Sequence, residues 1–357
     1  MRFVPTFCLR DGMILGKSLF SKDGGLLLNS GQTISSSYIT KIHNLGYQGV
    51  YIFDNLSEDI VIESIIDDEL RFSAIKAVKD IYIFSQSDGK ADPTLVPRTK
   101  TLCYDLVDQI IDNKQAIVNM IDLKVFDDYT FYHSVNVAVL SIIIGVRLDM
   151  PRNELYRLGL SALLHDIGKV FIPKEIIDKK CKLTNEEFDK IKKHTTYGYN
   201  YLRDKFDIPS KSYLGALQHH EKYDGTGYPE CTKGENISNF GRIISVADVY
   251  DALTSDRPYR KAMPTSEVME YIMGGAGSIF DPNYVYIFTR KVAAYPLGTC
   301  VRLSNGLIGI AVENFEDCCM RPKIKIITED SLAKPKYIDL KNDREYMNVI
   351  ITDIEKM

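Results

Sequence analysis

The sequence has no tryptophan and only six histidines among its 357 residues. Its seven cysteines are scattered and none forms a CxxC pair, so we expect reduced thiols and neither a disulfide framework nor a thiolate zinc site. Neither sign of charge is in large excess. A net charge of -4 disfavours non-specific binding to duplex DNA or to anionic membranes.

Long hydrophobic runs are also lacking. The richest run, from Val135 to Val146, is shorter than the roughly 18 residues that a membrane span needs. No charged segment followed by an apolar run opens the sequence. We therefore expect a cytoplasmic protein that has no membrane contact. Its 45% hydrophobic and 26% charged residues are typical of a globular protein.

Local patterns predict four parts. A hairpin around Asp23-Gly24-Gly25, a short helix over 35–45 and a strand over 49–53 predict a small α/β N-terminal module, residues 1–55. Helical spacing over 56–84 and the SQSDGKADP stretch predict a helical connector with a linker, residues 56–97. A helical domain is expected over 98–295. Strands at 301–303, 308–312, 323–327 and 348–351, with a turn at Asn305-Gly306, predict a β-rich C-terminal extension, residues 296–357.

The connector's apolar stripe, which includes Ile62, Ile65, Ile66 and Leu70, permits two interpretations. It is either core within the same chain or the contact face of a connector or dimer helix. The sequence does not distinguish these two interpretations. The dimer-helix interpretation would make the protein a homodimer.

The histidines are concentrated in the helical part, where five of the six lie between His133 and His220. His133 shares a helix face with Val137 and Leu140, which is typical of a buried face. A buried imidazole or carboxylate is costly unless it is hydrogen-bonded or binds a metal. One such residue would indicate only a hydrogen-bonded core histidine, but seven together predict a metal site. The seven are His133, His165, Asp166, His194, His219, His220 and Asp248.

Histidine and aspartate ligands without cysteine indicate iron, manganese or zinc. Seven ligands are too many for one ion, and two ions about 3.5–4 Å apart form the arrangement that hydrolyses phosphoesters. Asp166, which adjoins a histidine, is the expected bridge between them. The expected chemistry is attack on phosphorus by a hydroxide that bridges the metals.

Blocks of sequence around these residues resemble the HD-GYP domain, a branch of the HD phosphohydrolase superfamily, over roughly residues 98–295. They are HSVNV, HDIGK, HTTYG, HHEKYDGTGYP, ADVYDALTSDRPYR and FDP, in family order. The HD dipeptide is a weak signal, whereas the HHExxDGxGYP run is highly specific. The resemblance implies an all-helical bundle, hence a mainly α protein, that hydrolyses cyclic di-GMP to linear pGpG, or on to GMP, at a metal centre that is commonly iron.

The resemblance also implies roles for individual residues. It carries over the seven metal ligands, and Lys169 matches the lysine that meets the substrate phosphate. Asp166 and Lys169 are therefore the expected catalytic residues. Arg257 and Arg260 match a basic pair that faces the phosphates, with surface cations as the alternative.

The signature loop has two interpretations. Two glycines permit tight turns, proline fixes one φ angle, and tyrosine can stack on a base of the substrate. Alternatively the loop is structural, braces the paired histidines and contacts protein partners. The loop residues are Gly225, Gly227, Tyr228 and Pro229, and the expected supports of the ligands or the loop are Glu221, Asp224 and Asp251. Asp251 could instead be an acid on the surface of its helix.

One departure from the family concerns the number of metals. Some members carry a glutamate four residues before the first histidine, where it helps to bind a third ion. Tyr129 occupies that position here, with Asp127 and Asp128 out of register. We therefore predict two divalent ions, iron first and manganese as the alternative, and pGpG as the main product.

Three functions compete. A cyclic di-GMP phosphodiesterase leads. The second is an HD hydrolase of another nucleotide or cyclic dinucleotide, which the intact GYP run disfavours. The third is a non-catalytic cyclic-dinucleotide sensor or interaction module, which the intact ligand set disfavours.

Overall fold

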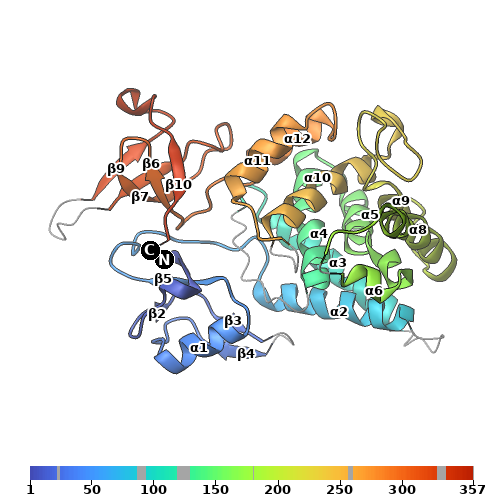
Figure 1. Cartoon of the computed structure of the whole chain (residues 1–357), viewed down its shortest axis with the longest axis horizontal. Coiled ribbons are helices and arrows are strands. Elements are labelled where there is room, and N and C mark those ends of the chain that lie inside the picture. Colours follow the sequence, from blue (N-terminus) through green and yellow to red (C-terminus); the bar gives the residue numbers. More distant parts are fainter. Residues whose placement is uncertain are drawn as a thin grey trace.

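The computed structural model describes residues 1–21, 25–86, 94–118, 129–179, 181–255, 260–327 and 335–356, leaving aside the side chain of Tyr129. A mainly α-helical bundle is accompanied by two small β-rich parts, one before it and one after it in the sequence (Figure 1), so the predicted fold class is confirmed. The N-terminal part and the C-terminal sheet lie on the same side of the bundle, next to one another.

The N-terminal part has the elements that the sequence predicts. Strands β1, β5 and β2 form an antiparallel sheet in the order β1-β5-β2, and β3 pairs with β4 in the expected hairpin. The hairpin turn at 22–24 lies outside the described residues. The bounds are β1 (Arg2–Pro5), β2 (Ile14–Leu15), β3 (Leu19–Phe20), β4 (Leu26–Leu28), α1 (Ser36–Asn44) and β5 (Gly49–Phe53).

The connector differs from its prediction. Helix α2 spans Asp68–Gln86, so the expectation of a helix from Leu56 is wrong. Ile60 and Ile62 do not continue a helical stripe, because they pack in an irregular segment against Tyr51, Cys300 and Ile310. The buried face of α2 belongs to the main core of the bundle, which favours the intramolecular interpretation.

The bundle is built around α4 (Tyr129–Arg147), which packs against α2, α5, α10 and α12. Its window Thr130–Arg147 has a mean hydropathy of 1.3, so by length and composition α4 could cross a membrane, contrary to our expectation for this stretch. However, 78% of that window is buried inside the protein, as expected for a core helix. The other bundle helices are α3 (Leu95–Asp112), α5 (Arg152–Leu163), α6 (Lys174–Ile177), α7 (Asn185–Lys192), α8 (His194–Lys205), α9 (Ser212–Gln218), α10 (Asn239–Thr254), α11 (Thr265–Gly274) and α12 (Pro282–Lys291).

The C-terminal part is an antiparallel sheet in the order β10-β6-β7-β8-β9. The strands predicted at 301–303, 308–312 and 323–327 are present. The first two are connected by the expected turn at Gly306, whose φ of +85° suits glycine. Strand β9 was not predicted, and β10 begins later than expected. The bounds are β6 (Cys300–Leu303), β7 (Ile308–Glu313), β8 (Lys323–Ile326), β9 (Lys336–Asp339) and β10 (Ile351–Ile354).

Candidate metal centre

The bundle brings all seven predicted ligands into one buried cluster. Each lies at or near the end of a helix or on an inward face, where a side chain can reach the centre of the bundle. His133 lies in the first turns of α4, His165 and Asp166 directly follow α5, and His194 begins α8. His219 and His220 follow α9, and Asp248 lies on α10.

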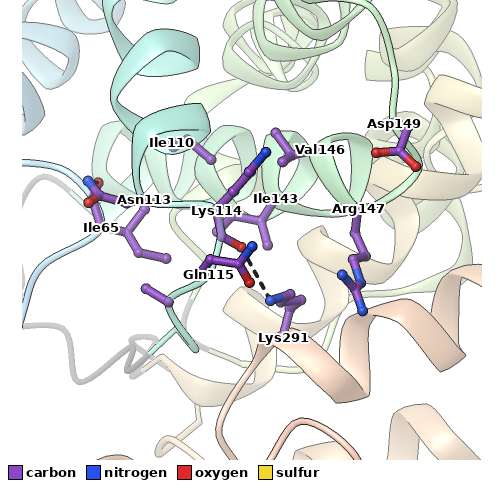
Figure 2. A pocket seen from close by; sticks show the side chains of 11 residues that line it. Ile65, Ile110, Asn113, Lys114, Gln115, Ile143, Val146, Arg147, Asp149 and Lys291 are labelled. Atoms are coloured by element: carbon purple, nitrogen blue, oxygen red, sulfur yellow. Dashed lines mark hydrogen bonds between the residues drawn. The ribbon is translucent and has the colours of Figure 1, made fainter.

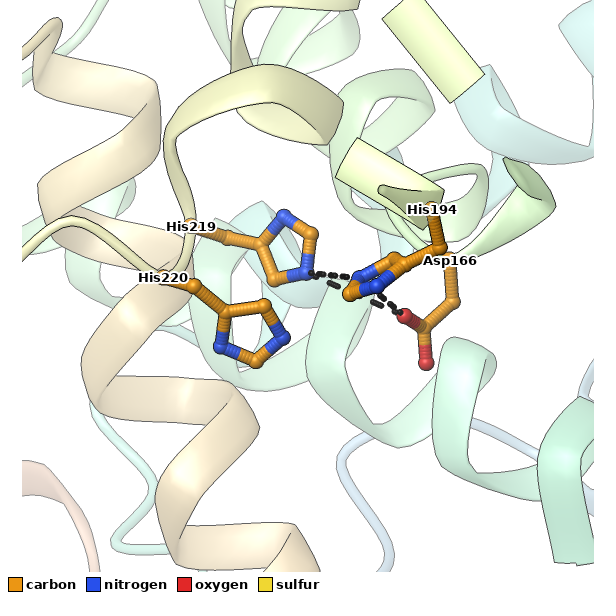
Figure 3. Close-up of side chains that lie close together, drawn as sticks. All are labelled: Asp166, His194, His219 and His220. Carbon is orange, nitrogen blue, oxygen red and sulfur yellow. Dashed lines mark hydrogen bonds and ion pairs between the residues drawn. The ribbon is translucent and has the colours of Figure 1, made fainter. Parts of the chain in front are cut away.

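Asp166 lies between two groups of histidines. With His194, His219 and His220 it forms a set whose ligand atoms all lie within 4.8 Å of one another (Figure 3). With His133 and His165 it forms a second set, whose ligand atoms also lie within 4.8 Å of one another. Asp166 is thus the member that the two sets share.

Asp248 faces the cluster from α10. Its Oδ1 atom lies 3.1 Å from Nε2 of His133 and 4.0 Å from Nε2 of His165. Its Oδ2 atom lies 3.9 Å from Nδ1 of His220. The second carboxylate therefore approaches histidines of both sets.

Backbone carbonyls fix the orientation of three imidazoles. Nδ1 of His165 donates to the carbonyl of Ala162 at 2.8 Å, and Nδ1 of His194 donates to that of Ile191 at 2.7 Å. Nδ1 of His219 donates to the carbonyl of Gly215 at 2.9 Å. Each neutral ring then presents an unprotonated Nε2 to the centre, which is the usual orientation of a metal-binding histidine.

These lone pairs need a cation. Nε2 of His194 and Nε2 of His219 face one another at 3.3 Å, although neither carries a proton in these tautomers. Two ligands of one ion, each at about 2.1 Å, would be about 3.0–3.4 Å apart. Within the described part of the chain, Nε2 of His165 and Oδ1 of Asp166 are buried without a hydrogen-bond partner. The cluster therefore fits a site for divalent metal ions.

Most pKa shifts agree with this charge distribution. The exception is His133: burial alone would lower its pKa, but the carboxylates of Asp248 and Asp251 raise it. Burial lowers the pKa of His194 to about 3 and lowers that of His220 well below its usual value, so both rings are neutral at pH 7. Burial alone would raise the pKa of both carboxyl groups. However, Lys169 and the histidines hold the pKa of Asp166 well below its ordinary range, and His133 does the same for Asp248.

Asp251 supports the cluster from one turn further along α10. One of its oxygens lies 2.7 Å from Nδ1 of His133, and the other accepts a hydrogen bond from the amide of Asn136 at 2.9 Å. Asp251 is only 1% exposed, so the interpretation as a surface acid is wrong. Arg71 on α2 extends this network to Asn136 at 3.4 Å. Our sequence analysis missed Asn136, which the spacing of three residues from His133 could have indicated.

The signature loop is anchored by its acidic residues. The buried carboxylate of Glu221 accepts hydrogen bonds from the backbone N–H groups of Glu230 and Thr232, at 2.7 and 3.0 Å. Asp224 accepts from the backbone and the hydroxyl of Thr226 within the loop. Both residues thus support the loop, which is one of the two roles that we expected for them.

The glycines of the loop are needed for different reasons. Gly225 has a φ of +86°, which side-chain-bearing residues rarely adopt. Gly227 is crowded instead: a Cβ atom there would lie 2.2 Å from the backbone nitrogen of Lys222 and 2.5 Å from Cα of Glu221. The loop therefore folds back closely onto the residues that follow the paired histidines.

Tyr228 lies beside the cluster, and Pro229 follows it through a cis peptide bond. The Tyr228 ring centroid is 4.8 Å from that of His220 and 6.4 Å from that of Phe188. The Lys192 ammonium lies over both the Phe188 and the Tyr228 rings, at 5.3 and 6.0 Å from their centroids. Our sequence analysis missed Phe188 and Lys192; their spacing of four residues just before His194 could have indicated a shared face.

The predicted phosphate-binding cations lie in different settings. Lys169, in the short 3₁₀ helix Ile167–Phe171, is 30% exposed and forms an ion pair with Asp166. Arg260 donates to the backbone carbonyl of Ala252 at the end of α10, so its guanidinium braces this helix. Arg257 lies outside the described residues, as do Asp127 and Asp128.

The family model of the HD domain matches residues 106–284, half of the chain. The cyclic di-GMP phosphodiesterase PA4108 of Pseudomonas aeruginosa is 38% identical over 226 residues, which cover 62% of this chain and 54% of that protein. The 3'3'-cGAMP-specific phosphodiesterase 3 of Vibrio cholerae is 36% identical over 168 residues, 47% of this chain and 36% of that protein. The chain spans about half the length of the first curated relatives it matches.

A solved structure has the same fold. Bd1817, an HDG"Y"P protein from Bdellovibrio bacteriovorus, superposes with a TM-score of 0.52 over 80% of this chain and 97% of that chain. At 18% sequence identity this likeness concerns the fold alone.

Proposed function

The chain belongs to the HD domain family, and its GYP run places it in the HD-GYP branch; on this basis we propose that it hydrolyses cyclic di-GMP to linear pGpG. One observation carries the proposal: Asp166 belongs at once to two sets of histidines, which are buried except for the half-buried His220. A shared carboxylate of this kind suits two ions, and two ions suit phosphodiester hydrolysis.

The metal ligands we propose are the seven residues of the cluster, and the ions we propose are iron first and manganese second. When bound, such ions supply a nucleophile from water and stabilise negative charge on phosphorus. The protein's own residues hold the geometry. Asp251 orients His133, the backbone orients three further rings, and Glu221 holds the loop that follows His220.

We propose that the substrate binds at the exposed side of the cluster. Lys169 is half-buried there and can turn its ammonium from Asp166 to a substrate phosphate. Tyr228 and Phe188 offer aromatic faces to a base, and Lys192 adds positive charge beside them. Arg257 and Arg260 remain proposed phosphate contacts, although Arg260 also braces the end of α10.

A second substrate class is supported by the relatives. The Vibrio cholerae relative is named as specific for 3'3'-cGAMP, another cyclic dinucleotide. The first curated relatives that the chain matches are named cyclic di-GMP phosphodiesterases, so we propose cyclic di-GMP first and a mixed purine dinucleotide second. We also propose a cytoplasmic location, two ions per chain, and no role for duplex nucleic acid.

The test is anaerobic purification, elemental analysis and chromatography of the products formed from each cyclic dinucleotide. We expect two metals per chain and pGpG as the main product. Asp166→Ala should lower turnover at least about 1000-fold, because the loss of two-ion binding removes several kcal/mol of transition-state stabilisation.

Asp204→Ala is a matched control, because this aspartate is 55% exposed near the end of α8 and pairs with its neighbour Arg203, not with a proposed substrate contact. Equal turnover by the wild type and Asp166→Ala would contradict the mechanism. Three tightly bound metals would contradict the two-ion proposal. Binding of a cyclic dinucleotide without hydrolysis, with iron or manganese present, would favour a sensor.

A further inference from the structure

A cavity of about 230 Å³ is lined by residues near the C-terminal end of α4 (Figure 2). His133 is near the start of α4, whereas the cavity is lined by Ile143, Val146 and Arg147 near its end. At about 1.5 Å per residue the two places are roughly 20 Å apart along the helix. The cavity is therefore separate from the proposed active site.

The cavity combines an apolar wall with polar groups. Ile110 of α3 and Ile143 and Val146 of α4 form apolar lining, and Gln115 brings an amide. The Lys114 side chain extends across the cavity toward Val146 (Figure 2). Binding sites for small organic molecules have this mixture of apolar walls and a few placed polar groups.

The charged lining is mainly positive. Lys291 is only 3% exposed, and its ammonium donates to the carbonyl of Lys114 at 3.3 Å and pairs with Glu316. Arg147 reaches the same Glu316 carboxylate at 3.4 Å. The Glu316 carboxylate of the C-terminal part thus forms ion pairs with two cations.

Lys114 adds a third positive charge. Among the ion pairs of the described residues, none involves its ammonium. Asp149 is the one acidic residue among the described lining residues. An anion would therefore find excess positive charge from Lys114 and Arg147 at the exposed mouth of the cavity, next to an apolar wall.

We propose that this cavity binds a small organic phosphate. The phosphate group lies against Lys114 and Arg147, and an aromatic or apolar body lies against Ile143 and Val146. Glu316 acts as an internal anion that competes for Arg147 and Lys291. The proposal does not depend on the hydrolytic activity, because the cavity shares no residue with the metal centre.

The test uses the full chain carrying Asp166→Asn, stripped of metal by chelation, so that phosphates cannot bind to metal ions at the proposed active site. Calorimetric titrations with guanosine monophosphate, phenyl phosphate and inorganic phosphate measure binding. We expect one site per chain, with the two organic phosphates binding more tightly than inorganic phosphate. Adding Lys114→Glu and Arg147→Glu should weaken binding about 10–100-fold, because charge-assisted hydrogen bonds are lost.

Two further variants sharpen the result. Glu316→Gln should tighten binding, since it removes the competing carboxylate. Arg344→Glu, an exposed cation in the C-terminal part, is the matched charge-reversal control and should leave binding unchanged. No binding by either organic phosphate would overturn the proposal, as would binding that survives the double reversal. Weaker binding in Glu316→Gln would overturn it even if the double variant failed to fold.

Discussion

Asp251 uses both carboxylate oxygens, one toward His133 and one toward Asn136. Removing it frees the His133 ring to rotate and to change tautomer. We expect Asp251→Ala to lower metal occupancy or turnover about 10–100-fold, the usual effect of losing such a support. Asp251→Asn, which keeps one acceptor, should fall between this variant and the wild type. Metals per chain and turnover are the measurements.

Asp105→Ala provides the control for this prediction. Asp105 is exposed on α3 and touches no residue of the cluster, so both quantities should stay at their wild-type values. If Asp251→Ala also kept full metal content and turnover, Asp251 would have no role in orienting His133.

Single residues also show what the sequence can reveal at this scale. The clustering of the seven proposed ligands was predictable because polar side chains at core positions break an apolar pattern. Asn136 and Phe188 were missed because an amide or an aromatic ring on a helix is common without any site, so their spacing from the histidines is a weak signal. Asp251 was ambiguous because helical spacing cannot say how much of α10 is covered, and the structure buries it.

The signature loop yields a prediction at the scale of an element. A methyl group at residue 227 would lie 2.2 Å from the backbone nitrogen of Lys222, so the loop would have to move away from His220. We expect Gly227→Ala to lower turnover about tenfold and the free energy of unfolding by about 1–3 kcal/mol. Turnover assays and chemical denaturation measure these effects.

Gly274 offers a matched glycine. A Cβ atom there would meet no atom within 4 Å, and the residue ends α11. Gly274→Ala should therefore leave turnover unchanged and stabilise the protein by up to about 1 kcal/mol. Equal behaviour of the two variants would mean that the crowding at Gly227 has no functional effect.

The main error of the sequence analysis concerns the residue at which helix α2 begins. Ile62, Ile65 and Ile66 have helical spacing, yet the helix begins only at Asp68. Ile62 is buried by residues that lie more than 200 positions further along the chain, including Cys300 and Ile310. Periodicity within a short window cannot distinguish a helix from an extended segment whose burial comes from so distant a partner.

At the scale of the molecule, Asp59 links the irregular segment before α2 to the C-terminal sheet. Its carboxylate accepts hydrogen bonds from Lys325 at 2.5 Å and from the Tyr337 hydroxyl at 2.6 Å. Burial alone would raise the pKa of Asp59, but these two bonds outweigh it and lower the pKa below the ordinary value of 3.8. A lowered pKa stabilises the fold above the unfolded-state pKa, and this stabilisation is lost as the pH falls through the folded-state pKa.

We therefore expect Asp59→Asn to be less stable than the wild type at pH 6–7, by about 1 kcal/mol or less for so exposed a pair. The difference should shrink as the pH falls below about 4. Denaturation of both proteins across this range is the measurement. A difference that grew with acidity would contradict the assigned pairing.

The contact between the two β-rich parts has a topological consequence. Phe3 donates its backbone N–H to the carbonyl of Gly298, and a Cβ atom at Gly298 would lie 3.2 Å from Cδ1 of Ile62. The chain therefore leaves the β-rich parts near residue 62 and returns to them near residue 298, so the helical bundle is inserted between two segments that contact one another.

Replacing residues 63–297 by a short flexible linker should unfold the C-terminal sheet, because buried residues of its strands, including Val301, Ala311 and Ile324, share one hydrophobic core with the bundle. Circular dichroism and amide-exchange protection can measure this effect. A shortened chain that kept both sheets would mean that they form an independent body. The shared core and the ion pairs of Glu316 with Arg147 and Lys291 thus couple the stability of the C-terminal part to that of the bundle.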